Sequence, residues 1–327
     1  MALGIDIGSY AVKLVETVNS ASGPALKSSG LKKIKGPSRA NASSALKELT
    51  GELNITAKEA NISVSGPSVL VRFLSMPKMK DEEMKSAVRF EAEKIIPFNL
   101  NDCIIDYHVI ADTPGGKSDL ILVAAKDGYV RDLIGTVEEC GFTVRVVDVD
   151  SLAVINAFSR YKKDLAVDKG IALVNIGAKS TNLAIIHGGA VCFIRDLASA
   201  GNDFSASVSR SLNIDASSAE DIKISPNEKM QAVINAVRQT LGDLSDDIKL
   251  SFNYYENQSG HGVDEIYLSG GSAALAGIEA FFQESFGVVP FFWNPLEPFS
   301  ATGGMAGAKE TTAMSGSFGV AAGLALR

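Results

Sequence analysis

The stretch that most constrains the fold lies near the amino end, at residues 3–16, and reads LGIDIGSYAVKLVE. An apolar run with one acid, Asp6, breaks at Gly8-Ser9 and then resumes with alternating apolar and polar residues. This pattern predicts two strands joined by a tight turn. Backbone N–H groups in such a turn can form a nest for an anion, to which Ser9 and Lys13 can add a hydroxyl and an ammonium group. Asp6 can orient a metal-bound water. An ordinary buried hairpin with one polar residue is the alternative.

The same design recurs at residues 172–187, which read ALVNIGAKSTNLAIIH. When Gly177 is superimposed on Gly8, Asn175 falls on Asp6. The strand, turn and strand therefore occur once in each half of the chain. A duplicated fold would place two phosphate-binding turns face to face across a cleft, where each holds one side of a nucleotide.

A third glycine turn, Gly270-Gly271-Ser272, follows the apolar stretch at 266–269 and opens onto a helical pattern over residues 273–285. The two glycines leave room for a flat ring against the backbone, and a helix N-terminus favours anions. Three turns in this order predict a nucleotide site more firmly than any one of them.

These motifs together resemble the actin–Hsp70–sugar kinase superfamily. More narrowly, nearly the whole chain resembles the PilM family, the actin-like proteins of type IV pilus assembly. The motifs behind this second resemblance are Pro77-Lys78-Met79, the run from Phe90 to Phe98 (FEAEKIIPF), Asp106-Tyr107, Asp148-Val149-Asp150, Ile266 to Gly271 and the ending Gly323 to Arg327.

The resemblance implies an α/β chain with the two-lobed actin-like ATPase fold. Its lobes would be duplicated ribonuclease H-like units, with an inserted small α/β subdomain of the FtsA and PilM type. We expect the first lobe core (1A) at 1–66 and 146–167, the inserted subdomain (1C) at 67–145, the second lobe core (2A) at 168–201 and 266–327, and a helical subdomain (2B) at 202–265. The inserted subdomain is expected to have the order β-α-β-β-α-β. The apolar stripe over 230–255 predicts one long helix or two in tandem, and 301–317 is interpreted as a surface loop.

The resemblance also implies the ligand, ATP or ADP with Mg²⁺, and Asp6 is expected to hold Mg²⁺ through water. In actin-like proteins a Glu and a Lys one turn apart contact ribose and adenine, and Glu220 and Lys223 match this spacing. A surface ion pair is the alternative for these two. The candidate cofactor-binding residues are Asp6, Gly8, Ser9, Tyr10, Lys13, Asn175, Gly177, Ala178, Lys179, Ser180, Thr181, Asn182, Gly201, Glu220, Lys223, Gly270, Gly271 and Ser272.

Two residues bear on catalysis. Asp150 ends a predicted strand, and it either caps the following helix, as Ser151 also can, or faces the nucleotide as a catalytic residue that positions a water. Asn175 stands where the superfamily has an Asp that holds Mg²⁺ through water. Loss of that charge about 5 Å from the metal weakens the interaction by roughly 3 kcal/mol, which would slow hydrolysis on the order of 100-fold. We therefore expect a bound nucleotide and at most a weak ATPase.

Bulk properties set limits on location. The formal net charge of −7 makes nucleic acid an unexpected partner. No apolar run approaches the roughly 18 residues of a membrane span, so direct membrane insertion is not expected. The chain begins at once with the first hairpin, which leaves no room for a secretory signal. Cys103, Cys140 and Cys192 are far apart, as in a protein of a reducing compartment. A cytoplasmic location follows.

The resemblance to PilM implies a partner: the N-terminal cytoplasmic segment of a PilN-like inner-membrane protein, beside other pilus assembly proteins. The protein would then be peripheral at the inner membrane through that partner. We place the partner groove near Arg89, Phe90, Ile95, Pro97 and Phe98, although these residues can instead simply pack the inserted subdomain. An FtsA-like, filament-forming cell-division ATPase is the second hypothesis, and a small-molecule kinase is the third.

Overall fold

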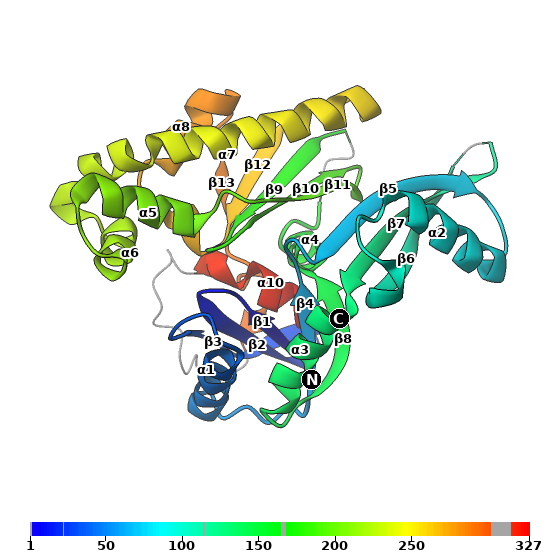
Figure 1. Cartoon of the computed structure of the whole chain (residues 1–327), viewed down its shortest axis with the longest axis horizontal. Coiled ribbons are helices and arrows are strands. Elements are labelled where there is room, and N and C mark those ends of the chain that lie inside the picture. The colour runs from blue at the N-terminus through cyan, green and yellow to red at the C-terminus, as the bar shows by residue number, and fades with distance from the viewer. Residues whose placement is uncertain (1, 22, 114, 165–167, 302–314) are drawn as a thin grey trace.

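A computed structural model describes residues 2–21, 23–113, 115–164, 168–301 and 315–327 (Figure 1). Most of the loop predicted at 301–317 therefore lies outside the described residues. The strands are β1 (Ala2–Ile7), β2 (Ala11–Ser20), β3 (Gly23–Lys33), β4 (Glu59–Val64), β5 (Val69–Pro77), β6 (Cys103–Thr113), β7 (Lys117–Lys126), β8 (Thr143–Val149), β9 (Gly170–Ile176), β10 (Thr181–His187), β11 (Ala190–Leu197), β12 (Glu265–Ser269), β13 (Phe291–Phe292) and β14 (Ser300–Ala301). The helices are α1 (Arg39–Glu52), α2 (Asp81–Ile95), α3 (Asp127–Glu138), α4 (Asp150–Tyr161), α5 (Gly201–Leu212), α6 (Ala216–Ile224), α7 (Met230–Ser259), α8 (Ile278–Phe286) and α10 (Gly319–Leu324), with short 3₁₀ turns η1 (Leu100–Asp102), η2 (Asn227–Lys229), η3 (Gly271–Ala274) and η4 (Gly316–Phe318).

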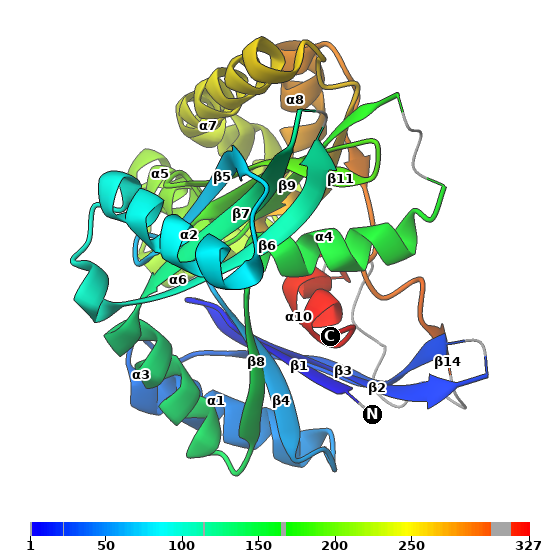
Figure 2. The same ribbon diagram turned by 90° about the vertical axis from the view of Figure 1, so that its right-hand side faces the viewer.

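The first lobe is built on a six-stranded sheet with the strand order β14-β3-β2-β1-β4-β8. The predicted hairpin is present, because β1 pairs antiparallel with β2 and Asp6 lies opposite Lys13. Apolar residues of β1 and β2 alternate toward a core that includes Leu46 and Leu49 of α1 and Val137 of α3. These two helices cover the outer face of the sheet (Figure 2).

The second-lobe sheet has the order β11-β10-β9-β12-β13 and matches the first sheet apart from the extra edge strand β14. β9 corresponds to β1, β10 to β2, β11 to β3 and β12 to β4. The turns match as well: Gly8 N donates to Ala11 O at 3.1 Å, and Gly177 N donates to Ser180 O at 3.1 Å. The prediction of two duplicated α/β lobes is therefore confirmed.

Two helices cross between the sheets (Figure 2). α4 packs on β9 and β10 of the second lobe, whereas α10 packs on β1 and β2 of the first. The contacts are so close that a Cβ on Gly323 would lie 1.7 Å from Ala153 O, and a Cβ on Gly4 would lie 2.1 Å from Ala321 O. The helix near the carboxyl end, α10, is buried. However, it covers the first-lobe sheet, although residues 266–327 were assigned to the second lobe.

The segment predicted as an inserted subdomain contains a separate small sheet. Its sheet has only three strands, in the order β5-β7-β6, and α2 packs Met84, Val88 and Ala92 against Leu120 and Leu122 of β7. The expected β-α-β-β-α-β order is present as β5, α2, β6, β7, α3 and β8, but its last two elements pack on the first lobe. α3 packs on α1, and β8 pairs with β4 in the first-lobe sheet. The subdomain boundaries stay a prediction, but these pairings favour an end after β7 rather than at residue 145.

The helical subdomain contains α5, α6 and one continuous helix, α7, of 30 residues. Its apolar stripe packs against β9, β10 and β12. The helix expected from residue 273 is interrupted: η3 ends at Ala274, and α8 begins only at Ile278. Gly277, with φ of +80°, makes the break, and a Cβ there would lie 2.9 Å from Ile234.

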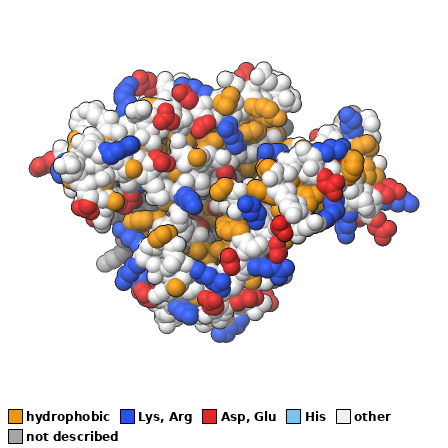
Figure 3. Space-filling model, viewed as in Figure 1, with side chains coloured by type: hydrophobic (Ala, Val, Ile, Leu, Met, Phe, Trp, Pro, Cys, Tyr) orange, Lys and Arg blue, Asp and Glu red, His pale blue; other side chains and the backbone are white. Residues whose placement is uncertain are grey.

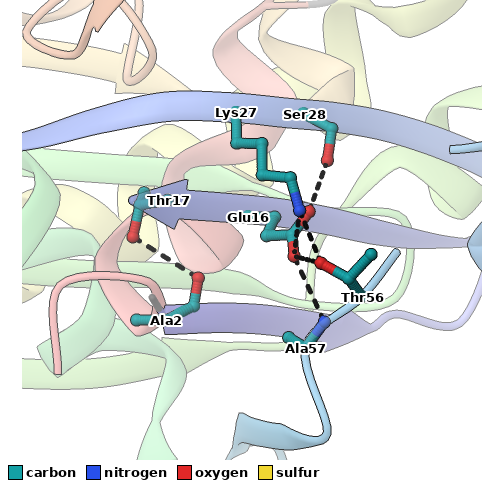
Figure 4. A network of polar contacts seen from close by, with 7 residues as sticks. All are labelled: Ala2, Glu16, Thr17, Lys27, Ser28, Thr56 and Ala57. Atoms are coloured by element: carbon teal, nitrogen blue, oxygen red, sulfur yellow. Dashed lines mark hydrogen bonds and ion pairs between the residues drawn. The ribbon is translucent and has the colours of Figure 1, made fainter. Parts of the chain in front are cut away.

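A buried carboxylate joins the far end of the first-lobe hairpin to the chain before β4 (Figure 4). Glu16 on β2 is fully buried. It accepts hydrogen bonds from Lys27 Nζ and Ser28 Oγ, both at 3.1 Å, and from Ala57 N at 3.3 Å. Because these donors lie on β3 and on the chain just before β4, Glu16 fixes β2, β3 and the approach to β4 together.

Two general features accompany this fold. Within the described ranges, none of the helices combines the length and apolar character that a bilayer crossing requires. On the face seen in Figure 3, acidic and basic side chains are interspersed over the surface. The three cysteines are unpaired, and each is half-buried.

Candidate functional site

A cavity of about 1990 Å³ lies between the two lobes. The two glycine turns, β1–β2 and β9–β10, both open into it, so Asp6 and Asn175 line one cavity. The predicted residues that line it are Asp6, Gly8, Ser9, Tyr10, Lys13, Asp150, Asn175, Gly177, Ala178, Lys179, Ser180, Asn182, Glu220, Gly271 and Ser272. The structure thus brings most of the predicted site together.

The first-lobe turn presents an ion pair to the cavity. Lys13 Nζ lies 2.7 Å from Asp6 Oδ2, because the two residues are direct neighbours across β1 and β2. Gly8 makes the turn compact, since a Cβ there would lie 3.1 Å from Ala11 O and 3.2 Å from Lys13 Nζ. Ser9 is exposed at the tip of the turn. An anion in this turn would find backbone N–H groups, a hydroxyl and an ammonium group within reach.

The second-lobe turn presents neutral amides at the corresponding positions. Asn175 Nδ2 donates to Asn182 Oδ1 at 3.0 Å, and Asn175 Oδ1 accepts from Ser269 Oγ at 3.2 Å. Asn182 Nδ2 in turn donates to Asp196 Oδ1 at 2.8 Å. Asn175 is therefore held at both ends of its amide, and its oxygen faces a hydroxyl donor.

Asp150 lies at the start of α4, but it does not cap the helix. The N-cap position is Val149, so the predicted capping role of Asp150 or Ser151 is wrong. The carboxylate of Asp150 instead accepts a hydrogen bond from Ser63 Oγ at 2.6 Å and lines the cavity. Burial, followed by the negative charge of Asp6, raises the pKa of Asp150 to about 6. A carboxyl group that ionises near neutral pH is suited to accept a proton from a water.

Four predicted residues support the cavity without lining it. Thr181 is buried and donates to Ser199 O at 2.8 Å. Gly201 lies against the second turn, because its N–H donates to Gly177 O at 3.0 Å and a Cβ would meet Ser272 Oγ. Gly270, with φ of +91°, allows close contact with the carbonyl of Ile176. These residues shape the backbone of the site.

The fourth of them is Lys223, which forms an internal ion pair. Its Nζ lies 2.7 Å from Glu220 Oε2 and 3.0 Å from Gly201 O, and the side chain is almost fully buried. Burial lowers the pKa of Lys223. The alternative of a surface ion pair is therefore wrong. Glu220 alone of the pair reaches the cavity, and it also accepts a hydrogen bond from Ser205.

Among the cavity residues that were not predicted, Ser63, Asp196 and Tyr129 carry polar side chains. Ser63 and Asp196 end strands whose neighbours become known only from the register, and Tyr129 is on α3, which sequence reasoning assigned to the inserted subdomain. Burial, together with the charge of Asp150, raises the pKa of Tyr129. The one available signal was that Ser63 and Asp196 are each the next-to-last residue of a strand, as Asp6 is.

The cavity fits a magnesium nucleotide better than a metal ion alone. In the part of the chain that the structure describes, no group of three or more His, Cys, Asp or Glu side chains could hold a metal ion. Mg²⁺ would therefore depend on ligands brought by phosphates, with Asp6 acting through water. At the third turn, a Cβ on Gly271 would meet nothing within 4 Å, which leaves space for a flat ring.

The predicted partner residues differ in how exposed they are. Pro97 and Phe98 line a small cavity of about 480 Å³ with Lys126 and Tyr129. Ile95 packs with the core of the inserted subdomain, as its alternative had it. Arg89 and Phe90 are exposed on α2, and Phe90 has 60% of its surface exposed, with Lys94 Nζ 4.3 Å from its ring centroid.

Comparison with known proteins identifies relatives over the whole chain. A family model described as the type IV pilus assembly protein PilM matches residues 4–327. A solved structure of a PilM–PilN type IV pilus biogenesis complex is 27% identical and has a TM-score of 0.90, with 100% of this chain and 98% of that chain covered.

Two further structures share the fold alone. The ethanolamine utilization protein EutJ from Carboxydothermus hydrogenoformans is 15% identical with a TM-score of 0.62, and 99% of this chain and 89% of that chain are covered. MreB5 of Spiroplasma citri bound to AMPPNP is 12% identical with a TM-score of 0.52, and the coverage is 98% and 93%. The actin-like ATPase fold is thereby established.

Curated proteins match over a shorter region. EutJ of Salmonella typhimurium (strain LT2) is 27% identical over 122 residues, which are 37% of this chain and 40% of that protein. EutJ of Escherichia coli (strain K12) is 24% identical over 123 residues, with 38% and 41% covered. The chain thus spans about two fifths of the length of these curated relatives.

Proposed function

The chain belongs to the PilM family of type IV pilus assembly proteins, and we propose that it is a nucleotide-binding scaffold of the pilus assembly platform. In this proposal ATP or ADP with Mg²⁺ binds between the lobes and fixes their relative orientation. The lobes then present a surface for the cytoplasmic segment of a PilN-like inner-membrane protein. The protein would be cytoplasmic and peripheral at the inner membrane through that partner.

One observation carries the nucleotide part of the proposal: two equivalent turns, one from each lobe, open into the same cavity. Lys13 Nζ and the N–H groups near Gly8 would bind phosphate from one side, and the turn from Gly177 to Ser180 would bind it from the other. Gly271, Ser272 and Glu220 line the same cavity. In this proposal the first two contact adenosine, and Glu220 accepts a hydrogen bond from a ribose hydroxyl. Bound Mg²⁺ would neutralise phosphate charge.

Slow hydrolysis follows from the second turn. Asn175 carries no charge, and its amide oxygen already accepts from Ser269 Oγ at 3.2 Å. It is therefore poorly placed to orient a metal-bound water. Asp150 lines the same cavity and is suited to accept a proton from a water, and its raised pKa, about 6, leaves it ionised at pH 8 but half-protonated near pH 6. We expect turnover far below one per second.

The partner part of the proposal is supported by the relative solved as a PilM–PilN complex, which aligns with the whole chain. The candidate surface on this chain includes Arg89, Phe90, Pro97 and Phe98 on the inserted subdomain. An extended segment with apolar side chains would bury Phe90 and fill the cavity beside Phe98. Attachment to other pilus assembly proteins would follow from the same membrane partner.

The nucleotide part is tested by calorimetric titration of ATP and ADP, with and without Mg²⁺. Lys13→Met should weaken ATP binding at least tenfold, because it removes the ammonium group from the first turn. Lys47→Met on the exposed face of α1 is the matched control. Wild-type protein that binds no nucleotide at millimolar concentration would contradict the proposal.

The partner part is tested by pull-down with a peptide from the cytoplasmic end of the membrane partner. Arg89→Glu and Phe90→Ala should reduce capture, whereas Lys85→Glu, also exposed on α2, should not. Equal capture by all variants would remove this surface from the proposal without affecting the nucleotide site.

A further inference from the structure

Four strands of the second-lobe sheet place polar side chains in one row at the edge of the cavity. Ser269 on β12 lies opposite Asn175 on β9, Asn175 opposite Asn182 on β10, and Asn182 opposite Asp196 on β11. Hydrogen bonds connect all four in the same order. The row is therefore a continuous chain of side-chain contacts.

The first lobe has the corresponding row, with its charges at different places. Asp6 on β1 lies opposite Lys13 on β2, and Lys13 lies opposite Leu31 on β3. By strand equivalence, Asp6 corresponds to Asn175, Lys13 to Asn182 and Leu31 to Asp196. In the first lobe the acid of the row, Asp6, is therefore on β1. In the second lobe the acid, Asp196, is on β11, two strands away from β9, which corresponds to β1.

Asp196 is exposed, its carboxylate accepts two hydrogen bonds, and no cation among the described residues pairs with it. Its Oδ1 accepts from Asn182 Nδ2 and its Oδ2 accepts from Gly66 N, both at 2.8 Å. Among the described residues, no Lys or Arg lies within ion-pair distance of this carboxylate. The neighbouring Arg195 is engaged elsewhere, with Ser251 Oγ at 3.1 Å and Asp247 at 3.7 Å.

Asp196 and Asp150 line the same cavity. Together with burial and the charge of Asp6, the charge of Asp196 contributes to the raised pKa of Asp150. Asp6 is paired with Lys13, whereas Asp150 and Asp196 line the cavity without an ion-pair partner in the described part of the chain. Two such carboxylates favour a divalent cation over a bare polyanion in this region.

We propose that Asp196 supplies the second-lobe carboxylate for Mg²⁺ that residue 175 lacks, acting through water as Asp6 does in the first lobe. The inference rests on the proposed nucleotide binding. In this arrangement Asn175 and Asn182 hold the carboxylate of Asp196 and do not contact the metal. Asp196 in turn positions Mg²⁺ through the water bound to it.

The row offers a charge swap as a test. In the double variant N175D/D196N, the donors and acceptors of the row can reverse: the new amide at position 196 would donate to Asn182, and Asn182 would donate to the new carboxylate at position 175. Every hydrogen bond of the row is kept, including the one from Gly66 N, while the acid moves to position 175. The single variant D196N removes the acid alone, and D243N, at an exposed site of α7 outside the cavity, is the control.

The measurement is the ratio of ATP affinity with Mg²⁺ to ATP affinity in EDTA, from calorimetric titrations, with thermal denaturation to verify folding. D196N should lower this ratio about tenfold, whereas N175D/D196N should restore it and D243N should leave it unchanged. Affinity in EDTA should not fall in D196N, as it would if Asp196 only supported the fold.

Each other result overturns the inference. If D196N keeps the wild-type ratio, or loses affinity equally with and without Mg²⁺, Asp196 does not serve the metal, and nucleotide binding by the wild type still stands. If the double variant fails to regain the ratio, the effect is not one of charge. If the wild type binds no nucleotide at all, the proposed function fails, and this inference fails with it.

Discussion

Asp150 provides a prediction that needs no ligand. Its pKa is raised from 3.8 to about 6, first by burial and then by the charge of Asp6. Between these two values the folded chain keeps a proton that the unfolded chain has lost, so stability falls as pH rises through this window. Well above pH 6 Asp150 is ionised in both states, and the full free-energy cost of its buried charge then lowers the stability of the fold.

The magnitude follows from the shift. Roughly two pKa units, at about 1.4 kcal/mol each, give roughly 3 kcal/mol as an upper value. Because the side chain is half-buried at the cavity and water partly screens it, we expect about 2 kcal/mol. Asp150→Asn keeps the acceptor for Ser63 Oγ and removes the charge. The variant should therefore be more stable than the wild type by about 2 kcal/mol at pH 8, and by roughly a third of that at pH 4.5.

Urea denaturation at pH 8.0, 7.0, 6.0 and 4.5, in EDTA and without nucleotide, measures this difference. Asp243→Asn, at an exposed position, is the control and should show no pH-dependent gain. The reasoning is refuted if Asp150→Asn is the less stable protein at pH 8, or if its advantage does not shrink as the pH is lowered.

Three further predictions concern the fold and the assembly. Glu16→Gln should lower the free energy of unfolding by about 2–4 kcal/mol, because a buried charge surrounded by donors from β3 and the chain before β4 is disrupted; denaturation of Ser28→Ala, which removes one donor, should show a smaller loss. Gly4→Ala should destabilise the fold strongly, since its Cβ would lie 2.1 Å from Ala321 O, whereas Gly51→Ala, in open space on α1, should stabilise it by about 0.5–1 kcal/mol. Thermal denaturation measures both effects, and an unchanged melting temperature for Gly4→Ala would contradict the structure. Finally, a scaffold that does not polymerise should remain in the supernatant on ultracentrifugation with Mg-ATP, and a nucleotide-dependent pellet would favour the FtsA-like hypothesis.

The hairpins could be predicted because their signals are local. Alternation over 3–16 and 172–187 specifies strands, and Gly8 and Gly177 mark the turns, so the paired positions of Asp6 and Asn175 follow without knowledge of the rest. The long helix α7 was predicted for the same reason, since its apolar stripe repeats without a break.

The misplaced elements depend on contacts distant in sequence. β8 has the pattern of any half-buried strand, and only its pairing with β4 assigns it to the first lobe. In the sequence Asp196 is one of many acids near a strand end, and only the register of β10 and β11 shows that it lies beside Asn182. Asp150 looked like a helix cap because aspartate commonly has that role, yet its neighbour Ser63 comes from a strand far earlier in the chain.

The crossing of α4 and α10 means that neither half of the molecule is self-sufficient. Ile171 and Leu173 of β9 and Ile186 of β10 are sealed by a helix that follows the first-lobe sheet in sequence, and the first-lobe sheet is sealed by the last helix of the chain. A fragment comprising either half would expose an apolar sheet face to water and aggregate. Two fragments produced together could recover a native core only if α4 of one fragment covered the second-lobe sheet and α10 of the other covered the first-lobe sheet.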